Sequence, residues 1–113
     1  MGKIKVVLSE EAHEFICQQD DKTRLKINAN IQRVADGMMD ISFFKKLRGS
    51  EIWEFRTKYS TMEYRVLAFW DKQEHLVIAT HGFVKKTQKT PQKEIDKAEK
   101  IMNEYYTSKK IKI

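Results

Sequence analysis

The chain has 113 residues, 41% of them hydrophobic and 34% charged, with a formal net charge of +6. This length predicts one domain with its own core, and the composition excludes an intrinsically disordered chain. Cys17 is the single cysteine, which excludes an intramolecular disulfide and a cysteine-based zinc site. Residues 1–8 do not have the pattern of a signal peptide, and no apolar run reaches membrane-spanning length, so we expect a cytoplasmic protein without membrane contact.

The first third of the chain predicts a strand followed by a helical hairpin. Ile4, Val6 and Leu8 recur at every second position, as in a half-buried strand. Ser9 and Asp20 are favoured N-cap residues and each precedes a helical pattern. The apolar stripe expected for the first helix is Ala12, Phe15 and Ile16. The stripe expected for the second helix is Ile27, Ile31, Val34, Ala35 and Met38.

From Phe43 onward the apolar pattern changes from helical to strand-like. Three strands are predicted, over residues 52–58, 64–70 and 76–83. In the first of them Trp53 and Phe55 alternate with charged residues, which places the two aromatic side chains in the core. The second strand is apolar apart from Arg65, as expected for a central strand covered on both faces.

A final helix is predicted after the third strand of this series. Thr90 and Pro91 are favoured as the cap and the first residue of a helix. The expected apolar face is Ile95, Ala98, Met102 and Tyr105 or Tyr106. Residues 108–113 are expected to form a flexible tail.

The predicted order is β-α-α-β-β-β-α, which indicates an α+β fold in a single domain, residues 1–113. It consists of an antiparallel sheet, an N-terminal helical hairpin and a C-terminal helix, with the helices packed on one face of the sheet.

The positive charge is concentrated in two blocks. Residues 43–65 carry six basic and three acidic side chains, and residues 85–113 carry nine and four. If the fold brings these blocks together, they form an anion-binding surface, and nucleic acid is the commonest large anion.

Four segments together carry a family resemblance: Phe44–Gly49 (FKKLRG), Ile52–Arg56 (IWEFR), Tyr64–Leu67 (YRVL) and His81–Pro91 (HGFVKKTQKTP). In order and spacing they resemble the RelE/HigB superfamily of toxins, and most of all its phage-derived, HigB-like branch. The predicted element order also fits the RelE-like fold.

The resemblance implies the toxin component of a type II toxin–antitoxin system. Such toxins are metal-independent endoribonucleases that cleave messenger RNA, in association with the ribosome, and use the RNA 2′-hydroxyl as nucleophile. No cofactor is implied. The implied partner is a cognate antitoxin, often of the helix-turn-helix type, with an acidic or helical segment that covers a basic cleft.

Position by position, the resemblance implies a set of functional residues. The catalytic candidates are Arg65, Arg56, Lys85, Lys86, His81 and Glu54. The candidates for binding flanking RNA are Lys58, Lys45, Lys46, Lys89, Tyr59 and Tyr64. Arginine suits a phosphate in the transition state because its planar guanidinium can bind two oxygens at once. His81 and Glu54 are the general acid–base candidates of the matched region.

Each of these assignments has a structural alternative. Arg65 lies in an apolar strand, where a salt bridge with Glu54 or Glu63 would also explain it. Arg56 could be ordinary solvated surface, and His81 could be a hydrogen-bonded structural imidazole. The basic run that follows could be a solvated loop.

The sequence departs from better-known relatives in its last helix. Relatives of the RelE type carry a tyrosine there, and relatives of the HigB type carry histidines near the C-terminus. Here Tyr105 and Tyr106 fall at the far end of the helix. Two other functions therefore stay open. One is a toxin of the same fold that poisons DNA gyrase, as ParE toxins do, although the basic residues argue against it. The other is a nucleic-acid-binding module without catalysis.

Overall fold

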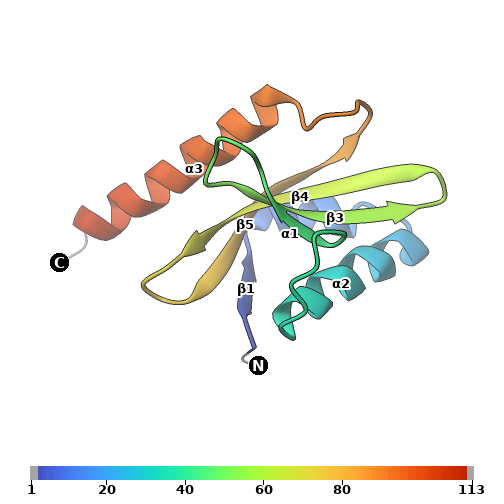
Figure 1. The fold of residues 1–113 in the computed structure, drawn as a ribbon, viewed down its shortest axis with the longest axis horizontal. Helices are drawn as coiled ribbons and strands as arrows, with labels where there is room; N and C mark the ends of the chain where they lie inside the picture. Colours follow the sequence, from blue (N-terminus) through green and yellow to red (C-terminus); the bar gives the residue numbers. More distant parts are fainter. Residues whose placement is uncertain (1–2, 112–113) are drawn as a thin grey trace.

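The computed structural model describes residues 3–111, which form five strands and three helices (Figure 1). In chain order these are β1 (Lys5–Leu8), α1 (Glu10–Cys17), α2 (Asp21–Ala35), β2 (Phe44–Lys46), β3 (Trp53–Tyr59), β4 (Met62–Asp71), β5 (Leu76–Lys85) and α3 (Gln92–Ile111). None of the helices in this range is both long and apolar enough to cross a membrane.

All strands belong to one sheet with the order β1-β5-β4-β3-β2. The predicted antiparallel meander is confirmed for β3, β4 and β5. Two details of the prediction were wrong. The strand β1 pairs in parallel with β5, so the sheet is mixed. The short strand β2 was not predicted, because three residues are too few to show a period; its pairing with β3, through Phe44 beside Phe55, defines it.

The predicted starts of the first two helices are confirmed. The Ser9 hydroxyl accepts from the backbone N–H of Ala12, and the Asp20 carboxylate accepts from that of Thr23. The second helix ends earlier than its apolar pattern predicted. It stops at Ala35, and the side chain of Met38 beyond it is exposed.

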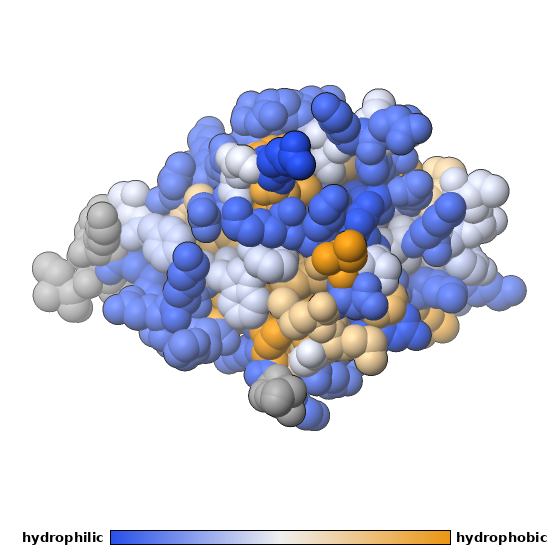
Figure 2. All heavy atoms as spheres, in the orientation of Figure 1, coloured by the Kyte–Doolittle hydropathy of each residue, from blue (hydrophilic) through white to orange (hydrophobic). Residues whose placement is uncertain are grey.

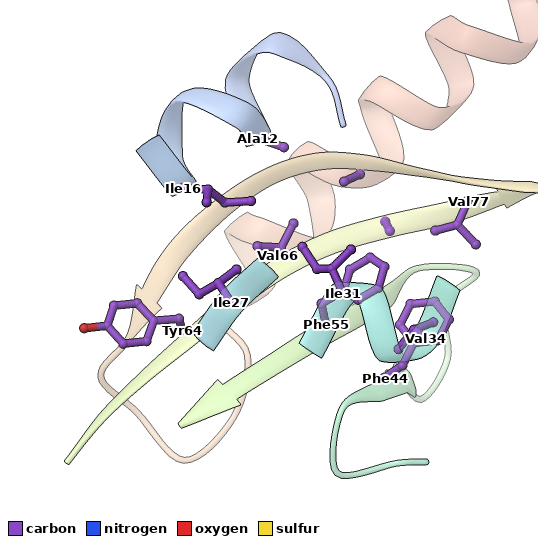
Figure 3. Close-up of a cluster of buried hydrophobic side chains, with 12 residues drawn as sticks. Ala12, Ile16, Ile27, Ile31, Val34, Phe44, Phe55, Tyr64, Val66 and Val77 are labelled. Carbon is purple, nitrogen blue, oxygen red and sulfur yellow. The ribbon is translucent and has the colours of Figure 1, made fainter. Parts of the chain in front are cut away.

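The helices cover both faces of the sheet, which corrects the prediction that they would pack on one face. Helices α1 and α2 pack on one face, where they bury the cluster shown in Figure 3. Helix α3 packs on the other face through Ala98, against Leu67 and Phe69. Because alternate residues of β4 are apolar on each side of the sheet, both faces need a cover.

Helix α3 begins at Gln92, directly after Pro91, and continues to Ile111. Residues 108–111 are therefore helical, where a flexible tail was expected; residues 112–113 lie outside the described residues. Asp71, at the end of β4, accepts hydrogen bonds from Tyr105 and from Lys109 at 2.8 Å. The bonds from Lys109 and Tyr105 hold the pKa of Asp71 well below its usual range. This contact fixes the second half of α3 on the sheet.

Candidate functional site

Strand alternation places several charged residues on the α3 face of the sheet, beyond the part that α3 covers. Arg56 of β3 lies directly opposite Arg65 of β4, and Glu63 of β4 lies opposite Lys85 of β5. Like charges directly opposite each other destabilise a strand pair. The two facing arginines therefore require a counter-charge between them, and Glu54 supplies it.

Glu54 is the centre of this group and is only 3% exposed. Its Oε2 lies 3.5 Å from Nε of Arg65 and 3.5 Å from Nε of Arg56. Its Oε1 accepts a hydrogen bond of 2.7 Å from the Thr90 hydroxyl. Both carboxylate oxygens are thus engaged by cations or a donor, which is the arrangement of a residue that orients its neighbours.

Arg65 is 2% exposed and lies between two carboxylates, those of Glu54 and Glu63. Its Nη2 donates to Glu63 at 2.7 Å and its Nη1 donates to the Tyr64 carbonyl at 3.2 Å, while its Nε faces Glu54. A buried arginine is tolerated when it is paired in this way. The salt bridges that formed the structural alternative for Arg65 are both present.

Arg56 differs from Arg65 in its exposure and its contacts. Its side chain is 28% exposed, and its Nη1 donates to the Ile41 carbonyl at 3.1 Å. The guanidinium keeps further N–H groups that can reach a ligand, because one guanidinium carries five donors. Of the two arginines, Arg56 is the one with access to the surface.

The side chain of Arg56 lines a cleft of about 490 Å³, which lies between β2, β3 and the start of α3. The cleft is lined by Lys45, Leu47, Arg48, Glu54, Arg56, Lys85, Gln88, Lys89, Thr90, Gln92 and Ile95. Five of these side chains are basic and one is acidic, so the cleft attracts anions. Hydrophilic side chains dominate the face of the molecule seen in Figure 2.

Lys85 lies at the inner side of the cleft, with its side chain only 10% exposed. Its Nζ is 4.0 Å from Glu63. Burial and the positive charge of Arg65 lower the pKa of the Lys85 amine, although Glu63 opposes this shift. A partly desolvated amine beside two guanidinium groups releases its proton more readily than an exposed lysine.

His81 is buried beneath the first turn of α3 and does not line the cleft. Its Nδ1 lies 3.0 Å from the Thr80 hydroxyl and its Nε2 lies 3.0 Å from Glu94. Nε2 donates to the Glu94 carboxylate, while Nδ1 faces the Thr80 hydroxyl, which donates its proton to the Leu67 carbonyl at 3.2 Å. Burial lowers the pKa of His81, and the hydrogen bond to Glu94 opposes that shift. These are the surroundings of a structural imidazole.

The other basic candidates are divided between the cleft and its surroundings. Lys45 and Lys89 line the cleft. Lys58 is exposed on the same face of β3 as Arg56, two residues further along. Lys86 is exposed just beyond Lys85, in an adjacent hollow. Lys46 lies outside the cleft and donates to the Ser50 carbonyl at 2.6 Å.

The two tyrosines among the candidates for binding RNA, Tyr59 and Tyr64, lie on the opposite face of the sheet. Tyr64 is 8% exposed and belongs to the core under α1 and α2 (Figure 3), and Tyr59 packs against that core. The sheet separates both rings from Arg56. Strand alternation predicts this separation, because Tyr64 is adjacent to Arg65 and therefore points to the other side.

Six residues of the cleft were not singled out from the sequence as part of a site: Leu47, Arg48, Gln88, Thr90, Gln92 and Ile95. Arg48 belongs to the matched segment Phe44–Gly49 but was given no role, and Thr90 was expected to cap a helix. The hydroxyl of Thr90 donates to Glu54 instead, across 36 residues of sequence. Within residues 3–111, no three histidine, cysteine, aspartate or glutamate side chains are grouped as a metal site would require.

Comparison with known proteins identifies a matching family and solved structures of similar fold. The family model described as "Phage derived protein Gp49-like (DUF891)" matches residues 14–103. A search of curated proteins finds no match.

Two solved structures from E. coli are similar in fold. Toxin RelE in the free state, as a mutant with two arginine-to-alanine substitutions, is 18% identical with a TM-score of 0.63. The alignment covers 88% of this chain and 97% of that one. The intact RelBE toxin–antitoxin complex contains a chain that is 16% identical with a TM-score of 0.57, and the alignment covers 76% of this chain and 99% of that one. The fold is therefore RelE-like.

Proposed function

The chain belongs to the Gp49-like family of phage-derived proteins and has a RelE-like fold, and we propose that it is a toxin that cleaves messenger RNA. The observation that carries the proposal is the basic cleft, in which Arg56, Lys85 and Lys89 from separate elements meet around the buried Glu54. A cleft of this kind suits a polyanionic strand better than a small neutral ligand.

The proposed reaction uses RNA, the side chains of the cleft and solvent water. The 2′-hydroxyl oxygen attacks the adjacent phosphorus, the bond to the 5′-oxygen breaks, and a 2′,3′-cyclic phosphate forms. The proton lost by the 2′-hydroxyl and the proton gained by the leaving 5′-oxygen balance; the Lys85 amine carries one of these transfers and solvent water carries the other. Negative charge builds on the phosphorane oxygens, and fixed cations stabilise it.

The contacts of each residue support different roles. Arg56, with its exposed guanidinium, binds a phosphate oxygen. Arg65 is buried between Glu54 and Glu63 and holds the strand ends in place. Lys85 is a candidate for proton transfer, because its pKa is lowered and its Nζ borders the cleft. Glu54 orients the arginines. His81, whose nitrogens are both engaged under α3, supports the fold.

We further propose a protein partner and a place of action. One of the two similar E. coli structures is the intact RelBE toxin–antitoxin complex. By analogy, an antitoxin, often of the helix-turn-helix type, would cover the basic cleft of this chain with acidic side chains. The toxin would act in the cytoplasm on messenger RNA bound to the ribosome.

A second candidate function is RNA binding without cleavage. It is favoured by the engagement of His81 with Thr80 and Glu94 and by the burial of Glu54, which leave Lys85 as the proton-transfer candidate among the described residues of the site. Gyrase poisoning, the third possibility, gains no support from a cleft whose basic residues converge as these do.

The test is translation in a cell-free extract with added purified protein, with message ends mapped by primer extension. We expect new cuts within the message. Arg56→Ala should reduce the cutting rate by about a hundredfold, the loss typical of removing one transition-state charge contact. Lys22→Ala is the matched control, since it removes an exposed positive charge at the start of α2, on the other side of the sheet.

The outcomes separate the three functions. Cutting that survives in Arg56→Ala at the wild-type rate contradicts the assigned site. An intact message with salt-sensitive RNA binding favours the non-catalytic alternative, and an intact message with inhibited gyrase favours the ParE mode.

A further inference from the structure

The basic loop formed by residues 86–89 lies in the connection between β5 and α3 and contributes Gln88 and Lys89 to the cleft. The residues that flank this loop, Lys85 before it and Thr90 after it, each contact a carboxylate of the sheet. At the first end, Nζ of Lys85 is 4.0 Å from Oε1 of Glu63. At the second end, the Thr90 hydroxyl donates to Oε1 of Glu54 at 2.7 Å.

The two carboxylates are joined by the guanidinium of Arg65. Its Nη2 donates to Glu63 at 2.7 Å, and its Nε lies 3.5 Å from Oε2 of Glu54. A continuous set of polar contacts therefore runs from one end of the loop to the other. We call it the loop network, and its members are Lys85, Glu63, Arg65, Glu54 and Thr90.

The centre of the loop network, Glu54 and Arg65, is shielded from water, so leaving either side chain without a partner is costly. Glu54 and Arg65 are 3% and 2% exposed. The Thr90 hydroxyl is a neutral donor to the carboxylate of Glu54, which also faces the guanidinium groups of Arg56 and Arg65. Removing it leaves a buried oxygen without its donor and frees the second end of the loop.

We propose that Thr90 is a positioning residue for RNA: through Glu54 it holds the basic loop over the cleft and keeps Arg56 aimed into it. The inference rests on the proposed function for its RNA ligand. Arg56 is included because its Nε and that of Arg65 face the same oxygen of Glu54, at 3.5 Å each. A shift of that carboxylate therefore moves both arginines.

A purely structural role for Thr90 predicts something different. A residue that only supports the start of α3 would change the stability of the helix and leave the loop and the RNA affinity alone. Thr90→Val removes the hydroxyl at nearly constant volume, and Thr90→Ser keeps the hydroxyl. This pair of variants separates the hydrogen bond from the packing.

The experiment uses the full-length protein in three forms: wild type, Thr90→Val and Thr90→Ser. Amide hydrogen exchange of residues 86–89 reports on the loop. Affinity for a short 2′-O-methyl RNA, which lacks the nucleophile, reports on binding, and kcat and KM on cleavable RNA report on the reaction. Urea unfolding checks that each variant is folded.

For Thr90→Val we expect faster exchange in the loop and a loss of RNA affinity of about tenfold, as for a lost hydrogen bond to a charged group. Thr90→Ser should retain the wild-type values. Unchanged loop exchange and affinity in Thr90→Val would overturn the proposal, and so would a Thr90→Ser variant as impaired as Thr90→Val.

The proposed function can fail separately. If wild-type protein binds RNA but leaves it intact, while Thr90→Val loosens the loop and weakens binding, cleavage is refuted and the positioning role of Thr90 stands. If wild type cleaves and Thr90→Val cleaves with unchanged kcat and KM, the cleavage proposal stands and the role of Thr90 is refuted.

Discussion

The two faces of the sheet are built from the same strands and differ in what covers them. On one face, α1 and α2 cover an apolar cluster that extends from Val77 to Tyr64 (Figure 3). On the other face, α3 covers an apolar cluster around Phe69, and the remaining part carries Glu54 and Arg56. Where a helix covers the sheet most of the residues are apolar, and where the sheet borders an open cleft they form a charged network.

Two neighbouring residues of β3 illustrate this difference. Phe55 is 1% exposed and packs against Phe44, with the ring centroids 4.5 Å apart. Arg56, the next residue, points to the other face and has a side chain 28% exposed. We infer that the helix-covered parts of the sheet maintain stability and the open charged part maintains function, so that substitutions in the two parts should have separable effects.

The largest effect on stability is expected for Phe55→Ala. Removing a buried aromatic ring leaves a cavity, and the free energy of unfolding should fall by about 3–5 kcal/mol. Arg56→Ala, one residue away, should lower it by less than about 1 kcal/mol, as for a partly exposed ion pair. Urea unfolding monitored by tryptophan fluorescence measures both. Equal losses for the two variants would contradict the separation of the faces.

An intermediate effect is expected for Gly82→Ala on the α1 face. A Cβ at Gly82 would lie 2.2 Å from Cδ2 and 2.7 Å from Cγ of Phe15. The ring of Phe15 must move, which should cost about 1–3 kcal/mol of stability. In the double variant with Phe15→Ala the added methyl group should cost much less, and thermal unfolding of the four proteins measures this coupling. Additive losses would show that the contact with Phe15 is not the cause.

The smallest effect is expected from the titration of His81, on the α3 face. Burial holds the pKa of His81 below its ordinary value of 6.5. Between that lowered pKa and 6.5 the unfolded chain binds more protons than the folded protein. The stabilisation is therefore complete above pH 6.5 and is lost as the pH falls through this window.

Urea unfolding at a series of pH values measures the slope. We expect the free energy of unfolding of the wild type to decline below pH 6.5, and His81→Gln to show a shallower decline over the same range. An identical slope in both proteins would mean that His81 does not titrate with folding.

Much of the fold could be predicted from local sequence patterns. The caps at Ser9 and Asp20, the alternation around Phe55 and the apolar strand around Arg65 were each predicted from a few neighbouring residues and are confirmed. Such features depend on interactions within one element. The parallel pairing of β1 with β5 and the packing of α3 on the second face depend on residues far apart in sequence, and these were not predicted.

The candidate site divides in the same way. The basic residues themselves, and the grouping of Glu54 with Arg56 on one side of β3, follow from the sequence. The burial of Arg65 between two carboxylates was one of two alternatives that the sequence left open. The position of Tyr64 on the opposite face follows from strand alternation, whereas the exclusion of His81 from the cleft required the position of α3.

The sequence by itself determined the composition of this protein's faces: which residues alternate, where helices begin, and that two basic blocks exist. Tertiary structure alone decided which of these residues meet. The Thr90 hydroxyl, expected to cap a helix, donates to Glu54 across 36 positions, because the turn after β5 returns the chain over β3. A contact of that kind is set by the paths of distant segments, and no local pattern of residues encodes it.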